Sequence, residues 1–247
     1  MSALAQFLTR MLGTHNPGRR ALMVLGMHRS GTSFLTGSLQ QAGLQLGEHS
    51  AWNPHNTRGN RENPGFVAFH EELLAARGKS WDDPPEGAED WTTTETDRAR
   101  ALVKGFGGGE LWGFKDPRAL LFAQSWQALL PGVRFVGIFR HPTSVSRSLE
   151  ARGAMPAERA RWLWRQYNER LLRLHEASPF PLLCFDDDEQ LLHRHLNAVL
   201  RGLRLRELGE ERFWDAGLRH HRSMDEPAPE DCAALYTALR NRSVGEA

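Results

Sequence analysis

The stretch from Val24 to Leu39, VLGMHRSGTSFLTGSL, constrains the fold more than any other part of this chain. An apolar run over Ala21–Gly26 predicts a buried strand, and apolar residues recur at helical spacing over Gly31–Ala42. The turn between them starts and ends with glycine, so its backbone amides can approach a ligand closely. A strand, a glycine-bounded turn and a helix in this order predict an anion-binding loop at the N-terminus of the helix.

The side chains of this loop favour an anion of moderate charge. Arg29 brings a permanent positive charge and a fork of N–H donors, and Ser30, Thr32 and Ser33 bring hydroxyls. A loop for nucleoside triphosphates has Lys after its second glycine, whereas Thr32 follows Gly31 here. We therefore expect a diphosphate-like group, and a phosphosulfate fits because its sulfate end carries only one negative charge.

A second motif, FRHPTSVSRSL, covers Phe139–Leu149. It follows Val133–Phe139, which is the clearest buried strand in the chain, and its helix begins at Pro142, a residue favoured at the first helical position. Arg140 ends the strand, and Ser148 lies eight residues later on the helix. This pair predicts a site for a second, separate phosphate.

Strands alternate with helices along the rest of the sequence. Two further strands are expected at Leu111–Lys115 and Pro181–Phe185. The further expected helices are Phe66–Arg77, Thr92–Phe106, Ala119–Leu130, Pro156–Ala177 and 188–201. This order predicts an α/β fold, a P-loop-like three-layer sandwich with a mostly parallel central sheet flanked by helices. We expect a single domain over residues 1–247, with an N-terminal helix or tail over 1–20.

The motifs follow the carboxyl ends of predicted strands, where parallel sheets bind their ligands. One shared site is therefore expected.

The formal net charge of +1 argues against a nucleic-acid partner. The N-terminal residues are too polar for a secretion signal or a membrane span, and no integral membrane segment is expected. The two cysteines, Cys184 and Cys232, have no metal-ligand spacing and favour a reducing, cytoplasmic location.

Together the two motifs resemble the sulfotransferase family, whose donor is 3′-phosphoadenosine 5′-phosphosulfate. HRSGTSFL is similar to the family's loop for the 5′-phosphosulfate, and RHPTSVSRS to its 3′-phosphate site, with the same Arg-to-Ser spacing. The resemblance covers roughly residues 21–152, and it implies transfer to a hydroxyl without a metal. The residues that it implies for donor binding are His28, Arg29, Ser30, Gly31, Thr32, Ser33, Arg140 and Ser148.

The resemblance also implies catalytic roles. Arg29 is expected to hold the 5′-phosphate and the transferring group. The segment GFKDPR places Lys115 at a strand end where bacterial family members carry a K-x-P segment, so Lys115 is expected to stabilise charge on the leaving oxygen. Asp116 and Arg118 either form a structural ion pair, or Arg118 joins the site.

The resemblance implies Glu62 as the general base. Some family members that act on glycans or tyrosine use a Glu from this part of the chain, the polar loop over 45–65. Cytosolic members use a His just after the strand Lys, and Pro117 occupies that place here. Glu48, His49 and His55 remain alternatives, and Glu62 could equally be a solvated loop carboxylate.

The resulting prediction is sulfuryl transfer to a hydroxyl of a glycan, a glycolipid or a small metabolite. Trp52 and Trp81 lie in loops that could line the acceptor pocket. The basic cluster over 219–222 either closes over the nucleotide or ends an exposed helix. Two alternatives stay open, a P-loop kinase whose LLCFDDD segment would hold magnesium, and a non-catalytic nucleotide-binding protein.

Overall fold

The computed structural model describes residues 20–49, 59–87, 90–106, 110–209 and 226–244. Its sheet has four strands in the order β2-β1-β3-β4, and every pairing is parallel. The strands are β1 (Arg20–Leu25), β2 (Leu111–Lys115), β3 (Arg134–Phe139) and β4 (Leu182–Cys184).

Both faces of the sheet are buried, which explains why its strands are continuous apolar runs. In β1, Met23 and Leu25 pack into the hydrophobic core on one face, while Leu22 and Val24 pack into the core on the other face. Alternate side chains of a strand point to opposite faces, so both sets must be apolar.

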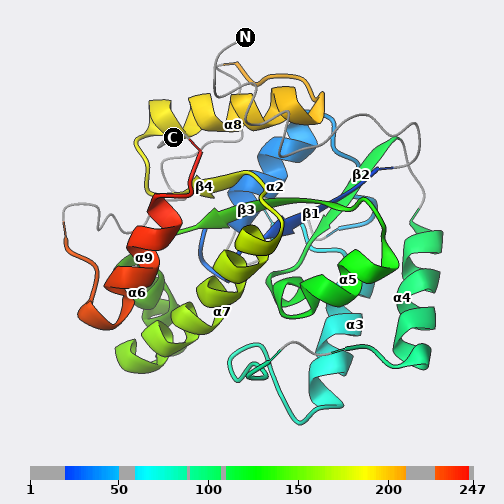
Figure 1. Cartoon of the computed structure of the whole chain (residues 1–247), viewed down its shortest axis with the longest axis horizontal. Helices are drawn as coiled ribbons and strands as arrows, with labels where there is room; N and C mark the ends of the chain where they lie inside the picture. Colours follow the sequence, from blue (N-terminus) through cyan, green and yellow to red (C-terminus); the bar gives the residue numbers. More distant parts are fainter. Residues whose placement is uncertain (1–19, 50–58, 88–89, 107–109, 210–225, 245–247) are drawn as a thin grey trace.

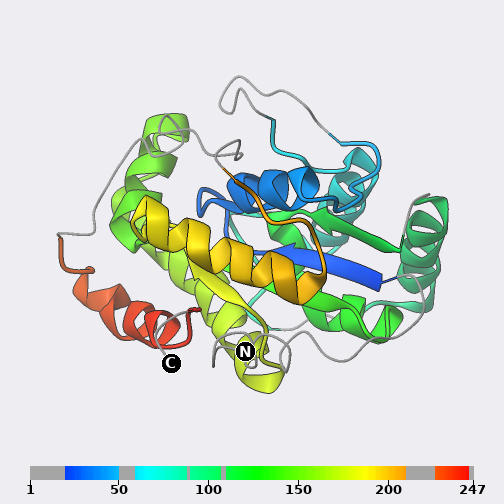
Figure 2. The same cartoon turned by 90° about the horizontal axis from the view of Figure 1, so that it is seen from above.

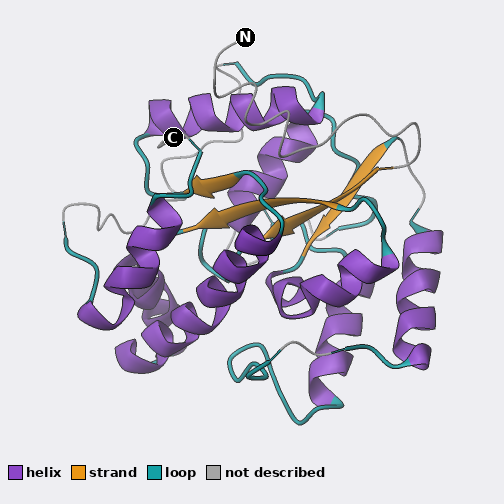
Figure 3. Ribbon diagram, viewed as in Figure 1, coloured by secondary structure: helices purple, strands orange, loops and turns teal. Residues whose placement is uncertain are grey.

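Helices cover each face and complete three layers (Figure 1, Figure 3). The core of one face is completed by α2 (Thr32–Gln41) and α8 (Glu189–Leu203). The other core is completed by α3 (Pro64–Ala75), α4 (Thr93–Gly105), η1 (Pro117–Phe122), α5 (Ala123–Leu129), α6 (Pro142–Gly153), α7 (Ala157–Ala177) and α9 (Glu230–Arg240). Figure 2 shows α8 running along one side of the sheet.

The predicted fold class is confirmed, with two differences in the helices. The helix expected over Ala119–Leu130 is a 3-10 helix, η1, followed by the α-helix α5. Asp116 caps η1 and Pro117 is its first residue, so this segment begins earlier and more tightly wound than the apolar spacing indicates. The helix α9 lies in the tail for which no element was predicted.

The fold brings three strand ends together. β1 lies between β2 and β3 in the sheet. The chain after β1 leads to the neighbour on one side, β2, and the chain after β2 then crosses to the neighbour on the other side, β3. Open α/β sheets bind ligands at such a point.

Among the described helices, none has the length and apolar character needed to cross a membrane. The expected single domain stays a prediction, and residues 1–19 lie outside the described part.

Candidate functional site

The turn after β1 presents the N-terminus of α2. Gly31 is the N-cap, with φ of +88°, and a Cβ atom added there would lie 2.4 Å from the ring of Phe185. Within the described residues no side chain caps α2, and its first turn has no acidic residue. The first N–H groups of the helix therefore keep their capacity to bind an anion. The buried Ser30 hydroxyl beside them has no hydrogen-bond partner among the described residues.

Arg29 connects the two predicted binding motifs. Its backbone has φ of +67°, an uncommon conformation for a residue with a side chain. Its Nε donates a 2.8 Å hydrogen bond to Oγ of Ser148, on α6. The loop after β1 and the helix after β3 are therefore in direct side-chain contact, across 119 residues of sequence.

Positive charge gathers around this contact. Burial lowers the pKa of Arg29 to about 10, helped by the nearby guanidinium groups of Arg152 and Arg140. Arg29 still carries its proton at neutral pH. Several cations around one point are suited to a ligand that carries more than one negative charge.

Arg140 is buried at the end of β3 and is oriented by an acidic residue that the sequence analysis did not assign to the site. Asp186 accepts a 3.3 Å hydrogen bond from Arg140 Nε and a 2.5 Å hydrogen bond from the backbone N–H of His141. The Arg140 guanidinium also lies over the ring of Phe185, 5.2 Å from its centroid. Arg140 is thus fixed beside the same ring that packs against Gly31.

The predicted catalytic pair meets at the end of β2. Lys115 Nζ donates a 2.7 Å hydrogen bond to Oε1 of Glu62, and the Lys115 side chain is only 2% exposed. Nζ also lies 3.5 Å from Oγ of Ser33 in the first turn of α2. Glu62 is consequently paired rather than freely solvated, and Ser33 links this pair to the anion-binding loop.

Asp116 and Arg118 form a structural ion pair, one of the two arrangements expected. Asp116 is fully buried and accepts a 2.9 Å hydrogen bond from Arg118. It also lies 2.9 Å from Nδ1 of His70, whose Nε2 accepts a hydrogen bond from Trp126. Hydrogen bonds from His70 and the Arg118 charge hold the pKa of Asp116 well below its usual range. This network anchors the chain directly after Lys115.

His28 packs among aromatic rings. Its ring centroid lies 4.7 Å from that of Trp81 and 6.1 Å from that of Tyr167. Burial and the nearby Arg118 charge lower the pKa of His28 to about 3, so its side chain is neutral at physiological pH. The Tyr167 hydroxyl donates to the backbone carbonyl of Trp81 and holds this loop on α7. The role of His28 in donor binding stays a prediction.

The other candidates for the base are placed differently. His49 Nε2 accepts a hydrogen bond from Gln40, and its Nδ1 donates to the carbonyl of Gly47. Glu48 lines a separate cavity between α3 and α4. His55, Trp52 and the basic cluster over 219–222 lie outside the described residues.

The acidic segment after β4 makes ion pairs with protein side chains. Asp186 pairs with Arg140, and Asp187 pairs with Arg240. Among the residues described, no three His, Cys, Asp or Glu side chains are grouped as a metal site would need.

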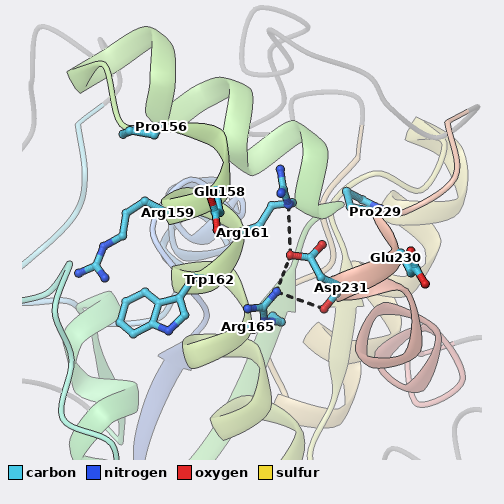
Figure 4. A pocket seen from close by; sticks show the side chains of 9 residues that line it. All are labelled: Pro156, Glu158, Arg159, Arg161, Trp162, Arg165, Pro229, Glu230 and Asp231. Atoms are coloured by element: carbon cyan, nitrogen blue, oxygen red, sulfur yellow. Dashed lines mark hydrogen bonds and ion pairs between the residues drawn. The ribbon is translucent and has the colours of Figure 1, made fainter.

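A separate groove of about 930 Å³ lies between α7 and the N-terminus of α9 (Figure 4). Two arginines of this groove already pair with a carboxylate of the same groove, since Asp231 accepts hydrogen bonds from Arg161 and Arg165. The guanidinium of Arg159 stacks on the ring of Trp162, 4.0 Å from the centroid. No residue predicted for the functional site lines this groove.

The comparisons with known proteins agree with this architecture. A model of the sulfotransferase family matches residues 21–178, which is more than half of the chain. Among solved structures, the chain is similar to the sulfotransferase domain of an olefin synthase from Synechococcus PCC 7002. The match has a TM-score of 0.50 at 16% identity and covers 95% of this chain and 92% of that chain. No curated protein sequence matches. The chain belongs to the sulfotransferase family.

Proposed function

We propose that this protein transfers a sulfuryl group from 3′-phosphoadenosine 5′-phosphosulfate to an acceptor hydroxyl. The observation that carries the proposal is the hydrogen bond between Arg29 and Ser148. It joins two motifs that each suit one anionic group, so a nucleotide with anions at both ends fits the pair. Sulfuryl transfer in general follows from membership of the family.

The residues around the loop fit such a donor. Among the described residues no side chain caps the N-terminus of α2, and the buried Ser30 hydroxyl has no hydrogen-bond partner. Arg29 with the loop amides would hold the 5′-phosphosulfate, while Arg140 and Ser148 would hold the 3′-phosphate. The donor would supply the sulfuryl group and a phosphate leaving group.

Lys115 and Glu62 are placed to act on the reacting groups. An ammonium has three N–H donors, and the described contacts of Lys115 use at most two of them, toward Glu62 and Ser33. A third donor can stabilise negative charge on a leaving oxygen. Glu62 is 16% exposed and would accept the proton of an acceptor hydroxyl that enters beside it.

The acceptor is proposed to be a glycan, a glycolipid or a small metabolite with a hydroxyl group. Trp81 supports a ring-shaped acceptor because its backbone is held on α7 and its side chain lies against His28, next to Arg29. A flat aromatic ring can pack against the face of a sugar or of another ring.

The test is a transfer assay with radiolabelled donor against a panel of hydroxyl acceptors, run for the wild type and Arg29→Ala. We expect label in at least one acceptor with the wild type, no magnesium requirement, and loss of transfer in Arg29→Ala at an unchanged melting temperature. Binding without transfer to any acceptor would contradict the enzymatic role. Phosphoryl transfer from ATP with magnesium would instead show a kinase.

A further inference from the structure

We propose that α9 positions the Arg140 side of the nucleotide site, with Arg240 and Tyr236 as positioning residues. This inference rests on the proposed function, in which Arg140 would hold the 3′-phosphate. Arg240 and Tyr236 are four residues apart on α9, so their side chains lie on the same face of this helix, one turn apart. Each of them contacts one of the two chain segments that orient Arg140.

Arg240 anchors the turn after β4. It donates a hydrogen bond to Oδ1 of Asp187, a carboxylate that is only 3% exposed, and Nδ1 of His195 on α8 lies 3.5 Å from the other oxygen of this carboxylate. The residue before Asp187 is Asp186, which accepts the hydrogen bond from Arg140 Nε. Because the two aspartates are consecutive, Arg240 fixes the backbone from which Asp186 reaches Arg140.

Tyr236 packs against both residues that flank Arg140 in the chain. Its ring centroid lies 4.9 Å from that of His141, in an edge-to-face arrangement, and 6.0 Å from that of Phe139. The ring of Trp164 lies 6.5 Å from Tyr236, and the Trp164 indole N–H donates a 3.0 Å hydrogen bond to the backbone carbonyl of Arg140. The backbone of Arg140 is therefore held between α7 and α9.

The burial of Asp187 makes the Arg240 anchor strong. A buried carboxylate that loses its charged partner is left uncompensated, and the segment around it must rearrange. Such a rearrangement would move Asp186 and, through it, the guanidinium of Arg140. A hydrogen bond from an arginine to a phosphate is worth about tenfold to a hundredfold in affinity, and a displaced Arg140 would lose part of that. We therefore expect the loss of Arg240 to weaken binding of the 3′-phosphate by roughly fivefold to twentyfold.

The experiment is isothermal titration of adenosine 3′,5′-bisphosphate into the wild type, Arg240→Ala, Tyr236→Leu and Arg242→Ala. Adenosine 5′-monophosphate, which has no 3′-phosphate, is measured with each protein by displacement of the bisphosphate. Arg242 is the control, because it pairs with Glu176 on the chain before β4, whereas the anchor from Arg240 lies after β4. We expect the Kd of the bisphosphate to rise about fivefold to twentyfold for Arg240→Ala and Tyr236→Leu, and the Kd of the monophosphate to stay within about twofold. Both Kd values should stay within about twofold for Arg242→Ala.

A second variant keeps the inference testable if Arg240→Ala does not fold. Asp187→Asn weakens the same anchor without leaving an unpaired buried charge, and it should raise the Kd of the bisphosphate in the same selective way. A bisphosphate Kd within twofold of the wild type in these variants would overturn the inference. Equal rises in Kd for both nucleotides would also overturn it, because a general loss of structure weakens both, and in either case the proposed function stands. If the wild type does not bind the bisphosphate, the proposed function fails, and this inference fails with it.

Discussion

Gly31→Ala should destabilise the protein because two separate costs meet at this position. The backbone of Gly31 has φ of +88°, a conformation that costs a residue with a Cβ about 1–2 kcal/mol. The new methyl would also lie 2.4 Å from one carbon of the Phe185 ring and 2.6 Å from another. That ring is 2% exposed, packs against Phe34 and lies under Arg140, so it cannot move aside freely. Overpacking of this kind costs about 1–3 kcal/mol.

The expected loss of unfolding free energy is therefore about 2–5 kcal/mol, or roughly 4–10 °C in melting temperature for a chain of this size. Urea denaturation and thermal melts measure it. Gly132→Ala is the matched control, because Gly132 has φ of +85° and a Cβ there would meet nothing within 4 Å. Gly132→Ala therefore measures the free-energy cost of the positive φ without a steric clash. Equal losses for the two variants would refute the conclusion that Phe185 shapes the anion-binding loop.

Two further predictions concern the candidate base Glu62 and the carboxylate of Glu95, which lies in the first turn of α4 and pairs with Arg77. Glu62→Gln should lower the turnover of sulfuryl transfer by roughly 10²–10⁴-fold and leave bisphosphate affinity within about twofold. Glu48→Gln is the control and should keep the wild-type turnover. Unchanged turnover in Glu62→Gln would exclude Glu62 as the base. Hydrogen bonds from Arg77 lower the pKa of Glu95 to about 2, from an ordinary value of 4.5. The charged form stabilises the fold, so the stability difference between wild type and Glu95→Gln should be present at pH 7 and shrink as the pH falls from about 4.5 to 2. A difference that does not depend on pH would contradict this assignment.

The layers of the fold were predictable because each strand is buried on both faces. Such strands are short apolar runs between turn residues, and β2 lies where its sequence pattern places it, over Leu111–Lys115. The helix α9 could have been predicted, because Cys232, Leu235, Tyr236 and Leu239 recur at the spacing of one apolar helix face and pack on the core. The start of η1 depends on a cap from Asp116, whose place in the fold is set by the distant His70.

The candidate site was predictable as residue types but not as contacts. Arg29 and Ser148 each follow from their motifs, yet their hydrogen bond depends on how α6 packs beside the loop. Asp186 belongs to an acidic segment visible in the sequence, where its carboxylates suggested magnesium, whereas the structure pairs this carboxylate with Arg140. An ion pair between distant residues leaves no local pattern in a single sequence.

We propose that one adenine nucleotide is bound at both ends, by the Arg29 loop and by the Arg140 and Ser148 pair. Isothermal titration with adenosine 3′,5′-bisphosphate, adenosine 5′-monophosphate and adenosine 3′-monophosphate tests it most directly. The bisphosphate should bind at least about tenfold more tightly than either monophosphate, since each phosphate would have its own charged partners. Equal affinity for the bisphosphate and the 5′-monophosphate would show that Arg140 and Ser148 bind no phosphate and would exclude binding at both ends.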